Sequence, residues 1–127
     1  MVSTPSKLPI VTAFGGGHGL AVSLRALRRL TDRLTAVVTV ADNGGSSGRL
    51  REEFDILPPG DLRRALAALC ADDHLGRTWA EVLQARFNGI GELAGHAIGN
   101  LLIAGLWQAW TWSVSSLTFG GASCRCP

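Results

Sequence analysis

The sequence has no long apolar run and little net charge. No stretch reaches the roughly 18 uninterrupted apolar residues that a membrane-crossing helix needs, so we expect no contact with a membrane. The formal net charge of +2 is too small to indicate a nucleic acid as partner. Residues 1–7 are short and polar and lack the apolar core of a signal peptide.

Cysteines are few and carry no recognisable pattern. Cys70, Cys124 and Cys126 have neither the spacing of a zinc site nor an even number for a disulfide framework. Cys70 lies in an apolar helical run, where we expect a buried thiol. Together these absences predict a protein of the reduced cytoplasm.

The composition is that of a globular protein. The 127 residues are 46% apolar and 17% charged, which favours one domain with a real core. We assign residues 8–110 to that domain and residues 1–7 to an N-terminal tail. No acidic residue follows Glu92, and no helical or strand period continues beyond Trp112. Residues 111–127 are therefore predicted to be an aberrant or disordered tail.

The first 40 residues predict a βαβ unit. Ile10–Phe14 is apolar on both faces, as in a parallel strand that is covered on both sides. Leu34–Val40 is rich in β-branched residues and reads as a second strand. The helix between them presents an apolar stripe, which consists of Leu20, Leu24, Leu27 and Leu30. This spacing predicts an α/β fold in which the two strands are adjacent and parallel.

Less regular helical patterns follow. The segment 50–57 is interpreted as a short helix or an irregular segment. Asp61 has the place of a helix N-cap, and a helix over Thr78–Phe87 is expected to bury Trp79. The segment 95–100 opens an apolar helix that runs to about Trp107. The stripe predicted for the helix after Asp61 is Leu62, Ala65, Leu66 and Leu69.

A glycine-rich turn joins the first strand to the first helix. It consists of Gly15, Gly16, Gly17, His18 and Gly19. Such a turn lets a phosphate approach the backbone amides, and the positive end of the helix dipole points at the same place. Leu20 stands where a dinucleotide fingerprint has its third glycine, and no Walker lysine follows. His18 either donates a hydrogen bond to the phosphate or only lines the turn.

A second polar loop follows the second strand. Its candidate ligand-binding residues are Asp42, Asn43, Gly44, Gly45, Ser46, Ser47 and Arg49. Amides, hydroxyls and a guanidinium form a good anion-binding set. Because the carboxyl ends of neighbouring parallel strands share one edge, both loops are expected to line one pocket. The alternative is a flexible surface loop that Asp42 caps.

Two further motifs contain polar residues that suit a site. Asp61, in the segment 58–63, is either a helix cap or a carboxylate that binds a ligand hydroxyl or a metal. His96 and Asn100 are four residues apart on a predicted helix and therefore face one side. They are either buried polar residues of the core or part of the site.

Taken together, these four motifs resemble the YvcK/CofD-like family. The resemblance covers about Leu8–Trp107, and its most specific part is the segment 39–51. One branch of that family is the bacterial gluconeogenesis factors, which bind UDP-sugars, and the other is the phospholactate transferases of deazaflavin synthesis. The transferases typically have an Asn-Thr-Gly-Asp-Asp type sequence where this chain has Asp42–Ser46, so the first branch is the better match.

The resemblance implies a Rossmann-like three-layer parallel sheet, incomplete here because the family's chains are much longer. It implies a non-catalytic regulator of carbon metabolism and cell shape that binds UDP-N-acetylglucosamine, requires no cofactor and forms homo-oligomers at full length. The residues 15–19 would bind the diphosphate, while Asp42, Asn43 and Asp61 would hold hydroxyl or base edges.

Three alternatives stay open. The chain is a phospholactate transferase that holds Mg²⁺ between Asp42, Asp61 and a diphosphate, an NAD-binding Rossmann protein, or an inactive fragment. Leu20 disfavours the NAD-binding alternative, because a dinucleotide site needs a glycine there.

Overall fold

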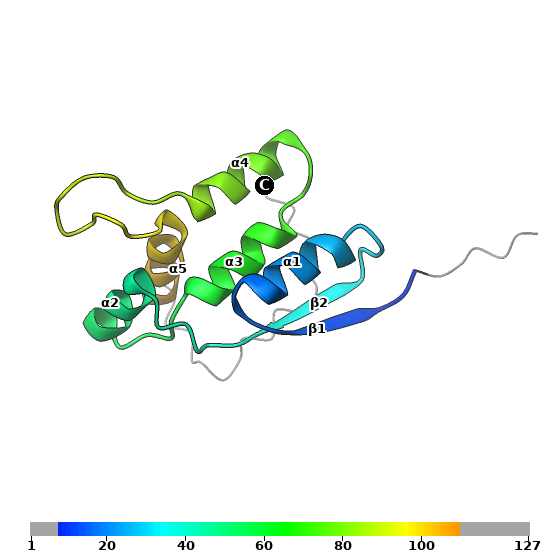
Figure 1. Cartoon of the computed structure of the whole chain (residues 1–127), viewed down its shortest axis with the longest axis horizontal. Helices are drawn as coiled ribbons and strands as arrows, with labels where there is room; N and C mark the ends of the chain where they lie inside the picture. Colours follow the sequence, from blue (N-terminus) through cyan, green and yellow to red (C-terminus); the bar gives the residue numbers. More distant parts are fainter. Residues whose placement is uncertain (1–7, 110–127) are drawn as a thin grey trace, which may run out of the picture.

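The computed structural model describes residues 8–109. Both predicted tails, residues 1–7 and 111–127, lie outside this range. The elements are β1 (Val11–Gly15), α1 (Gly17–Leu27), β2 (Leu34–Val38), α2 (Gly45–Phe54), α3 (Gly60–Leu69), α4 (His74–Gln84) and α5 (Ile98–Ala109) (Figure 1). None of these helices has the length and apolar character to cross a membrane.

The two strands form the predicted parallel pair. Their register runs from Val11 opposite Leu34 to Gly15 opposite Val38. Helix α1 connects them, so the βαβ unit and the α/β class are confirmed. Both strands point towards the end of the molecule at which α2 and α5 lie (Figure 1).

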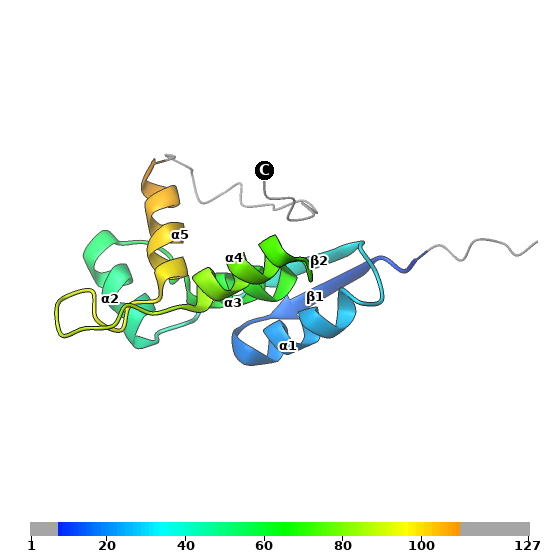
Figure 2. The same ribbon diagram turned by 90° about the horizontal axis from the view of Figure 1, so that it is seen from above.

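Helices α1 and α3 pack against each other and cover one face of the strands (Figures 1 and 2). The side chains that form this core are Leu20, Ala21, Leu24, Ala65 and Ala68, against which Ala13, Leu34, Ala36, Val38 and Leu69 pack. Cys70 is also buried, as predicted, and its thiol donates to the Leu66 carbonyl at 3.4 Å. The core is therefore a two-layer contact of helices on a sheet.

The opposite face of the strands is open in the described part of the chain. Phe14 is 75% exposed, and its register partner Val37 is 45% exposed. The prediction that β1 is covered on both faces is wrong for residues 8–109, because α1 and α3 lie on the same side. An apolar pair such as Phe14 and Val37 marks a face that further structure would bury.

Two helix starts differ from the predicted ones. Helix α2 begins at Gly45, so most of the predicted loop 42–49 is helical. It ends at Phe54, and the C-cap residue Asp55 that follows is left-handed, with φ of 50°. Helix α3 has Pro59 at its N-cap and no side-chain cap. Asp61 is therefore not the cap, because it lies inside the first turn, where its carboxylate binds other side chains.

The last two helices also start elsewhere. Helix α4 begins at His74, because the Asp73 side chain accepts a hydrogen bond from the Gly76 amide at 2.7 Å and so supplies a cap. With this start Trp79 is 39% exposed, and its predicted burial is wrong. Helix α5 begins at Ile98, because residue 97 pairs with residue 86 in an antiparallel bridge.

We predict that Leu24→Ala lowers the free energy of unfolding far more than Leu30→Ala does, although both residues belong to the predicted stripe. Leu24 is 0% exposed, whereas Leu30 follows the end of α1 and is 64% exposed. Leu24→Ala leaves a cavity and should lower the free energy of unfolding by about 2–5 kcal/mol. Leu30→Ala should change it by less than about 0.5 kcal/mol. Urea unfolding measures both, and equal losses would contradict this packing.

Candidate functional site

Two helices begin at the carboxyl edge of the strand pair. Helix α1 follows β1 almost directly, and α2 follows β2 after a short polar connection. Neither N-cap residue, Gly16 or Gly44, makes a side-chain cap hydrogen bond. Because the first amides of a helix have no partner within it, both helices present unbonded donors and a positive dipole end at this edge.

The turn before α1 requires two of its glycines. A Cβ on Gly16 would lie 2.1 Å from Thr39 Oγ1 and 2.4 Å from Asp61 Oδ2, which leaves no room for a side chain. Gly17 has φ of +60°, a conformation that glycine adopts without strain. His18 is exposed. The backbone of this turn thus lies directly against the start of α3.

An arginine joins the second predicted loop to the segment that contains Asp61. The Arg64 guanidinium lies 3.0 Å from Asp61 Oδ1 and 3.8 Å from Asp42 Oδ2. The second oxygen of Asp61 accepts a hydrogen bond from the Thr39 hydroxyl at 3.2 Å. Asp42 and Asp61, predicted from separate motifs, therefore share one cation. In residues 8–109 no group of three or more metal-ligating side chains accompanies them.

Asp42 organises the connection from β2 to α2. Its Oδ1 accepts from the Gly44 amide at 3.1 Å, and its Oδ2 accepts from the Ser47 hydroxyl at 2.7 Å. Burial alone would raise the pKa of Asp42. The two hydrogen bonds, with the positive charges of Arg64 and Arg63, outweigh burial and hold this pKa below its usual value. Asp42 is thus an ionised carboxylate that shapes the start of α2.

His96 and Asn100 both contact Ser46 of α2, although His96 lies before α5 and not on the predicted shared helix. Ser46 Oγ lies 3.0 Å from His96 Nδ1 and accepts from Asn100 Nδ2 at 3.0 Å and from the Ala97 amide at 3.2 Å. Asn100 also donates to Ser47 Oγ at 3.3 Å. These four polar side chains are all buried. They are bonded to one another, so they hold α2 against α5.

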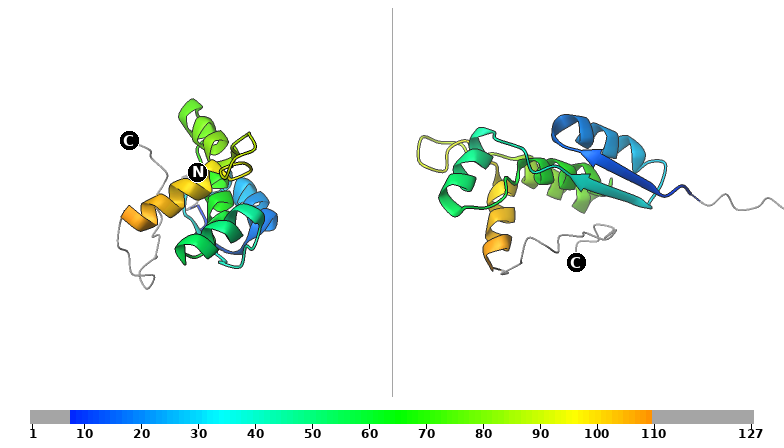
Figure 3. Two further views of the ribbon diagram at one scale, coloured as in Figure 1. Left: turned by 90° about the vertical axis from the view of Figure 1, so that its left-hand side faces the viewer. Right: turned by 90° about the horizontal axis from the view of Figure 1, so that it is seen from below.

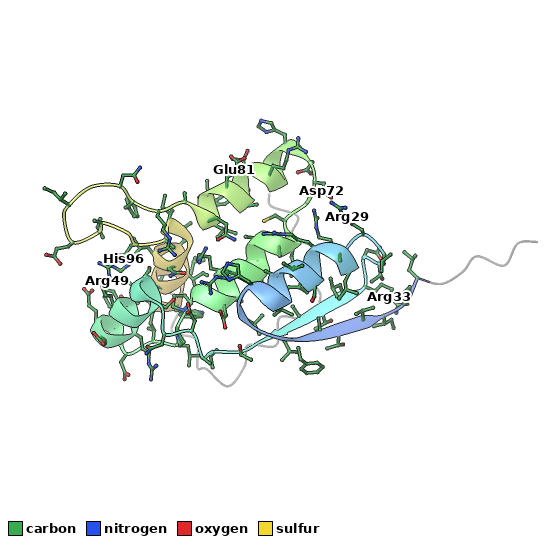
Figure 4. All side chains as sticks on the ribbon, in the orientation of Figure 1. Arg29, Arg33, Arg49, Asp72, Glu81 and His96 are labelled. Carbon is green, nitrogen blue, oxygen red and sulfur yellow. The ribbon has the colours of Figure 1, made fainter. Side chains whose placement is uncertain are left out.

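Arg49 connects α2 to the segment before α5. Its guanidinium donates to the carbonyls of Gly45, Glu92 and Ala94 at 3.3, 3.1 and 3.1 Å. Figure 4 shows Arg49 and His96 close together at this end of the molecule. Asn43, Gly44 and Gly45 are exposed beside it. Of the second predicted loop, these residues and Arg49 are the ones that face solvent.

Sequence reasoning missed the role of Arg63. This arginine is only 3% exposed, and it donates to Asn100 Oδ1 at 2.9 Å and to the Leu83 carbonyl at 3.5 Å, with a further contact to Gln84 Oε1. Burial lowers the pKa of Arg63, and the neighbouring charge of Arg64 adds to this effect. The predicted stripe of Leu62, Ala65, Leu66 and Leu69 gave no signal of this burial, because Arg63 lies outside it.

Helices α2 and α5 lie side by side at the end of the strands (Figure 3).

A comparison with known protein families matches residues 11–118 to the sequence model of the CofD family, which is described as 2-phospho-L-lactate transferase CofD. The chain belongs to this family. It is 50% identical over 98 residues to the gluconeogenesis factor of Bacillus subtilis, which covers 77% of this chain and 30% of that protein.

Two further proteins are similar to most of this chain. The chain is 63% identical over 103 residues to a Mycobacterium leprae protein provisionally named a gluconeogenesis factor, which covers 81% of this chain and 29% of that protein. A crystal structure of a Bacillus halodurans protein of the UPF0052 family matches with a TM-score of 0.67 and 47% identity, over 77% of this chain and 31% of that chain. The sequence is a homologue of gluconeogenesis factors and spans about 30% of their length.

We predict that Gly60→Ala is destabilising and that Gly45→Ala is not. A Cβ on Gly60 would lie 1.7 Å from Asp42 Oδ2 and 2.6 Å from Ser47 Oγ, whereas a Cβ on Gly45 meets nothing within 4 Å. Displacing the half-buried Asp42 carboxylate and its hydrogen bonds should cost about 1–3 kcal/mol. Gly45→Ala in a helix should be neutral or stabilise by up to about 1 kcal/mol. Chemical denaturation measures both, and a fully stable Gly60→Ala protein would refute the close contact.

We also predict a pH-dependent contribution of His96 to stability. Burial lowers the pKa of His96, and the charge of Arg49 lowers it further. A histidine with a lowered pKa stabilises the fold fully above the unfolded-state value of about 6.5. This contribution is lost as the pH falls through about 6.5 towards the folded-state pKa. Unfolding curves of wild type and His96→Gln should therefore converge with falling pH, and a constant difference would contradict the prediction.

Proposed function

We propose that the chain contributes the diphosphate-binding edge of a gluconeogenesis factor that binds a nucleotide sugar such as UDP-N-acetylglucosamine. One observation carries the proposal, namely that two uncapped helix starts lie at the carboxyl ends of two adjacent parallel strands. Helix starts of this kind bind phosphate groups through their free amides. We infer a role of the whole protein in carbon metabolism and cell shape, which its similarity to gluconeogenesis factors supports.

The exposed and buried residues have different roles in this proposal. The amides of residues 17–19 and of Gly45 contact the diphosphate, with His18, Asn43 and Arg49 beside them. The buried residues Ser46, Ser47, His96 and Asn100 keep α2 in place. Asp42 and Asp61, both paired with Arg64, fix the relative position of the two helix starts and offer oxygen atoms to ligand hydroxyls.

The proposed whole-protein architecture is a Rossmann-like three-layer sheet of which this chain supplies one edge. The exposed pair Phe14 and Val37 supports it, since further elements would bury this apolar face. In such folds the ligand lies outside the carboxyl ends of the strands. That place coincides with the starts of α1 and α2.

A Mg²⁺-dependent phospholactate transferase is the second candidate. The description of the family model names that activity, and the carboxylates of Asp42 and Asp61 are close enough to share one guanidinium. A divalent cation bound with a diphosphate would replace Arg64 as their common partner. The two candidates therefore predict different requirements for Mg²⁺.

We predict that the chain binds UDP-N-acetylglucosamine more tightly than NAD in calorimetry, without a requirement for Mg²⁺. Arg49→Ala should weaken binding about tenfold, because it removes a charge at the helix start and the links that order it. Arg51→Ala removes the same charge from the same exposed helix and is the control. It should change affinity by less than about twofold.

Three outcomes would overturn this proposal in different ways. Equal or stronger NAD binding would favour a dinucleotide site. Mg²⁺-dependent turnover of a phospholactate donor would favour the transferase. Binding to the full-length Bacillus subtilis relative but not to this chain would show that the chain is an inactive fragment.

A further inference from the structure

The buried hydrogen bonds between α2, α3 and α5 have a fixed direction. Arg63 has only donors, so the atom of Asn100 that it meets at 2.9 Å must be the carbonyl oxygen. The amide nitrogen of Asn100 then faces the hydroxyls of Ser46 and Ser47, at 3.0 and 3.3 Å. Arg63 thereby makes Asn100 a donor towards α2 in this network.

The direction continues through Ser46. Its oxygen accepts from the Asn100 amide nitrogen and from the Ala97 backbone amide, which uses both lone pairs of a hydroxyl. The hydroxyl proton must then be donated, and the remaining neighbour is His96 Nδ1, at 3.0 Å. His96 Nδ1 therefore accepts this proton and carries none of its own.

The other ring nitrogen of His96 is available to a ligand. A neutral imidazole whose Nδ1 accepts has its proton on Nε2. No hydrogen bond joins Nε2 to another atom of residues 8–109, and Nε2 is not one of the fully buried atoms of that range that lack a partner. It therefore reaches solvent as a donor, at the end of the molecule where α2 begins (Figure 4).

The charges around His96 favour the neutral ring. Two arginines oppose protonation of the ring, namely Arg49 on α2 and Arg86, which pairs with Ala97 just before α5. Glu53 on α2 favours protonation. Burial adds to the two arginines, since His96 is only 5% exposed. Protonation of Nδ1 would aim a third donor at Ser46 Oγ, whose two lone pairs already accept from Asn100 and Ala97.

We propose that Arg63 is a positioning residue that, through Asn100 and Ser46, holds His96 as the neutral Nε2–H tautomer. His96 thereby offers a neutral donor to an acceptor oxygen of the ligand, such as a sugar hydroxyl or a carbonyl, and not a cation to the diphosphate. The ligand contact rests on the proposed function. The tautomer is a property of the free protein.

The test is nitrogen-15 NMR of the imidazole rings in the full chain without ligand. The His96 signals are identified by their loss in His96→Gln, which separates them from those of His18 and His74. Near neutral pH we expect Nδ1 to resonate as an unprotonated nitrogen and Nε2 as a protonated one. A protonated Nδ1, or the fast tautomer average of a free imidazole, overturns the proposal.

Three variants test whether the direction of the hydrogen bonds, and not packing alone, sets the tautomer of His96. Arg63→Met removes the donor and should convert His96 to a mixture of tautomers, whereas Arg63→Lys keeps a residue that only donates and should restore the wild-type pattern. Ser47→Ala is the matched control. Ser47 also accepts a hydrogen bond from the Asn100 amide, but its own hydroxyl donates to Asp42 and not to His96. A wild-type pattern in Arg63→Met, or a changed pattern in Arg63→Lys or Ser47→Ala, contradicts the assignment.

Two further measurements keep the result decisive. If Arg63→Met does not fold, the wild-type spectrum and the Lys variant still decide, since both must show Nε2–H alone. Adding UDP-N-acetylglucosamine should shift the Nε2–H proton of wild type. Binding without such a shift overturns the ligand contact of His96, whereas no binding contradicts the proposed function and leaves the tautomer standing.

Discussion

Asn100 must satisfy its amide group without water, and much of the described structure depends on how it does so. The side chain is 2% exposed, and an unsatisfied buried amide would cost about 1–3 kcal/mol. Its oxygen and nitrogen are bonded to Arg63 on α3 and to Ser46 and Ser47 on α2. One residue of α5 thus fixes two other helices, and a shift of any of them leaves a buried donor or acceptor unpaired.

This constraint reaches the strand edge through Asp42. Ser47 receives a hydrogen bond from Asn100 and donates one to Asp42, whose other oxygen holds the Gly44 amide. The carboxylate also lies near Arg64, which binds Asp61 beside Gly16. A series of polar contacts therefore runs from α5 to the start of α2 and on to Asp61, which lies against the turn before α1. Networks of this kind specify one arrangement when every member is satisfied.

The sequence was sufficient for the βαβ unit, because local patterns determine it. The apolar run of β1, the β-branched run of β2 and the glycine turn depend on near neighbours in the chain. The helix start at Gly45 was not predictable in this way, since Ser46 and Ser47 are held by residues about 50 positions further along. Leu30 was misplaced because α1 ends at Leu27, before it. Trp79 was misplaced because the better-buried positions of α4 include Gly76, Ala80 and Leu83, a choice of face that tertiary packing makes.

The candidate site was predicted as a set of ligand contacts, but the structure divides that set into buried and exposed members. Helix α4 has a cap within the chain, since the Asp73 side chain accepts from the Gly76 amide. A side-chain cap contributes about 1 kcal/mol, yet α1 and α2 start at glycines that supply none. Buried polar side chains instead hold α2 against α5. Such an arrangement leaves the front amides free, which a chain selected for stability alone would have no reason to retain.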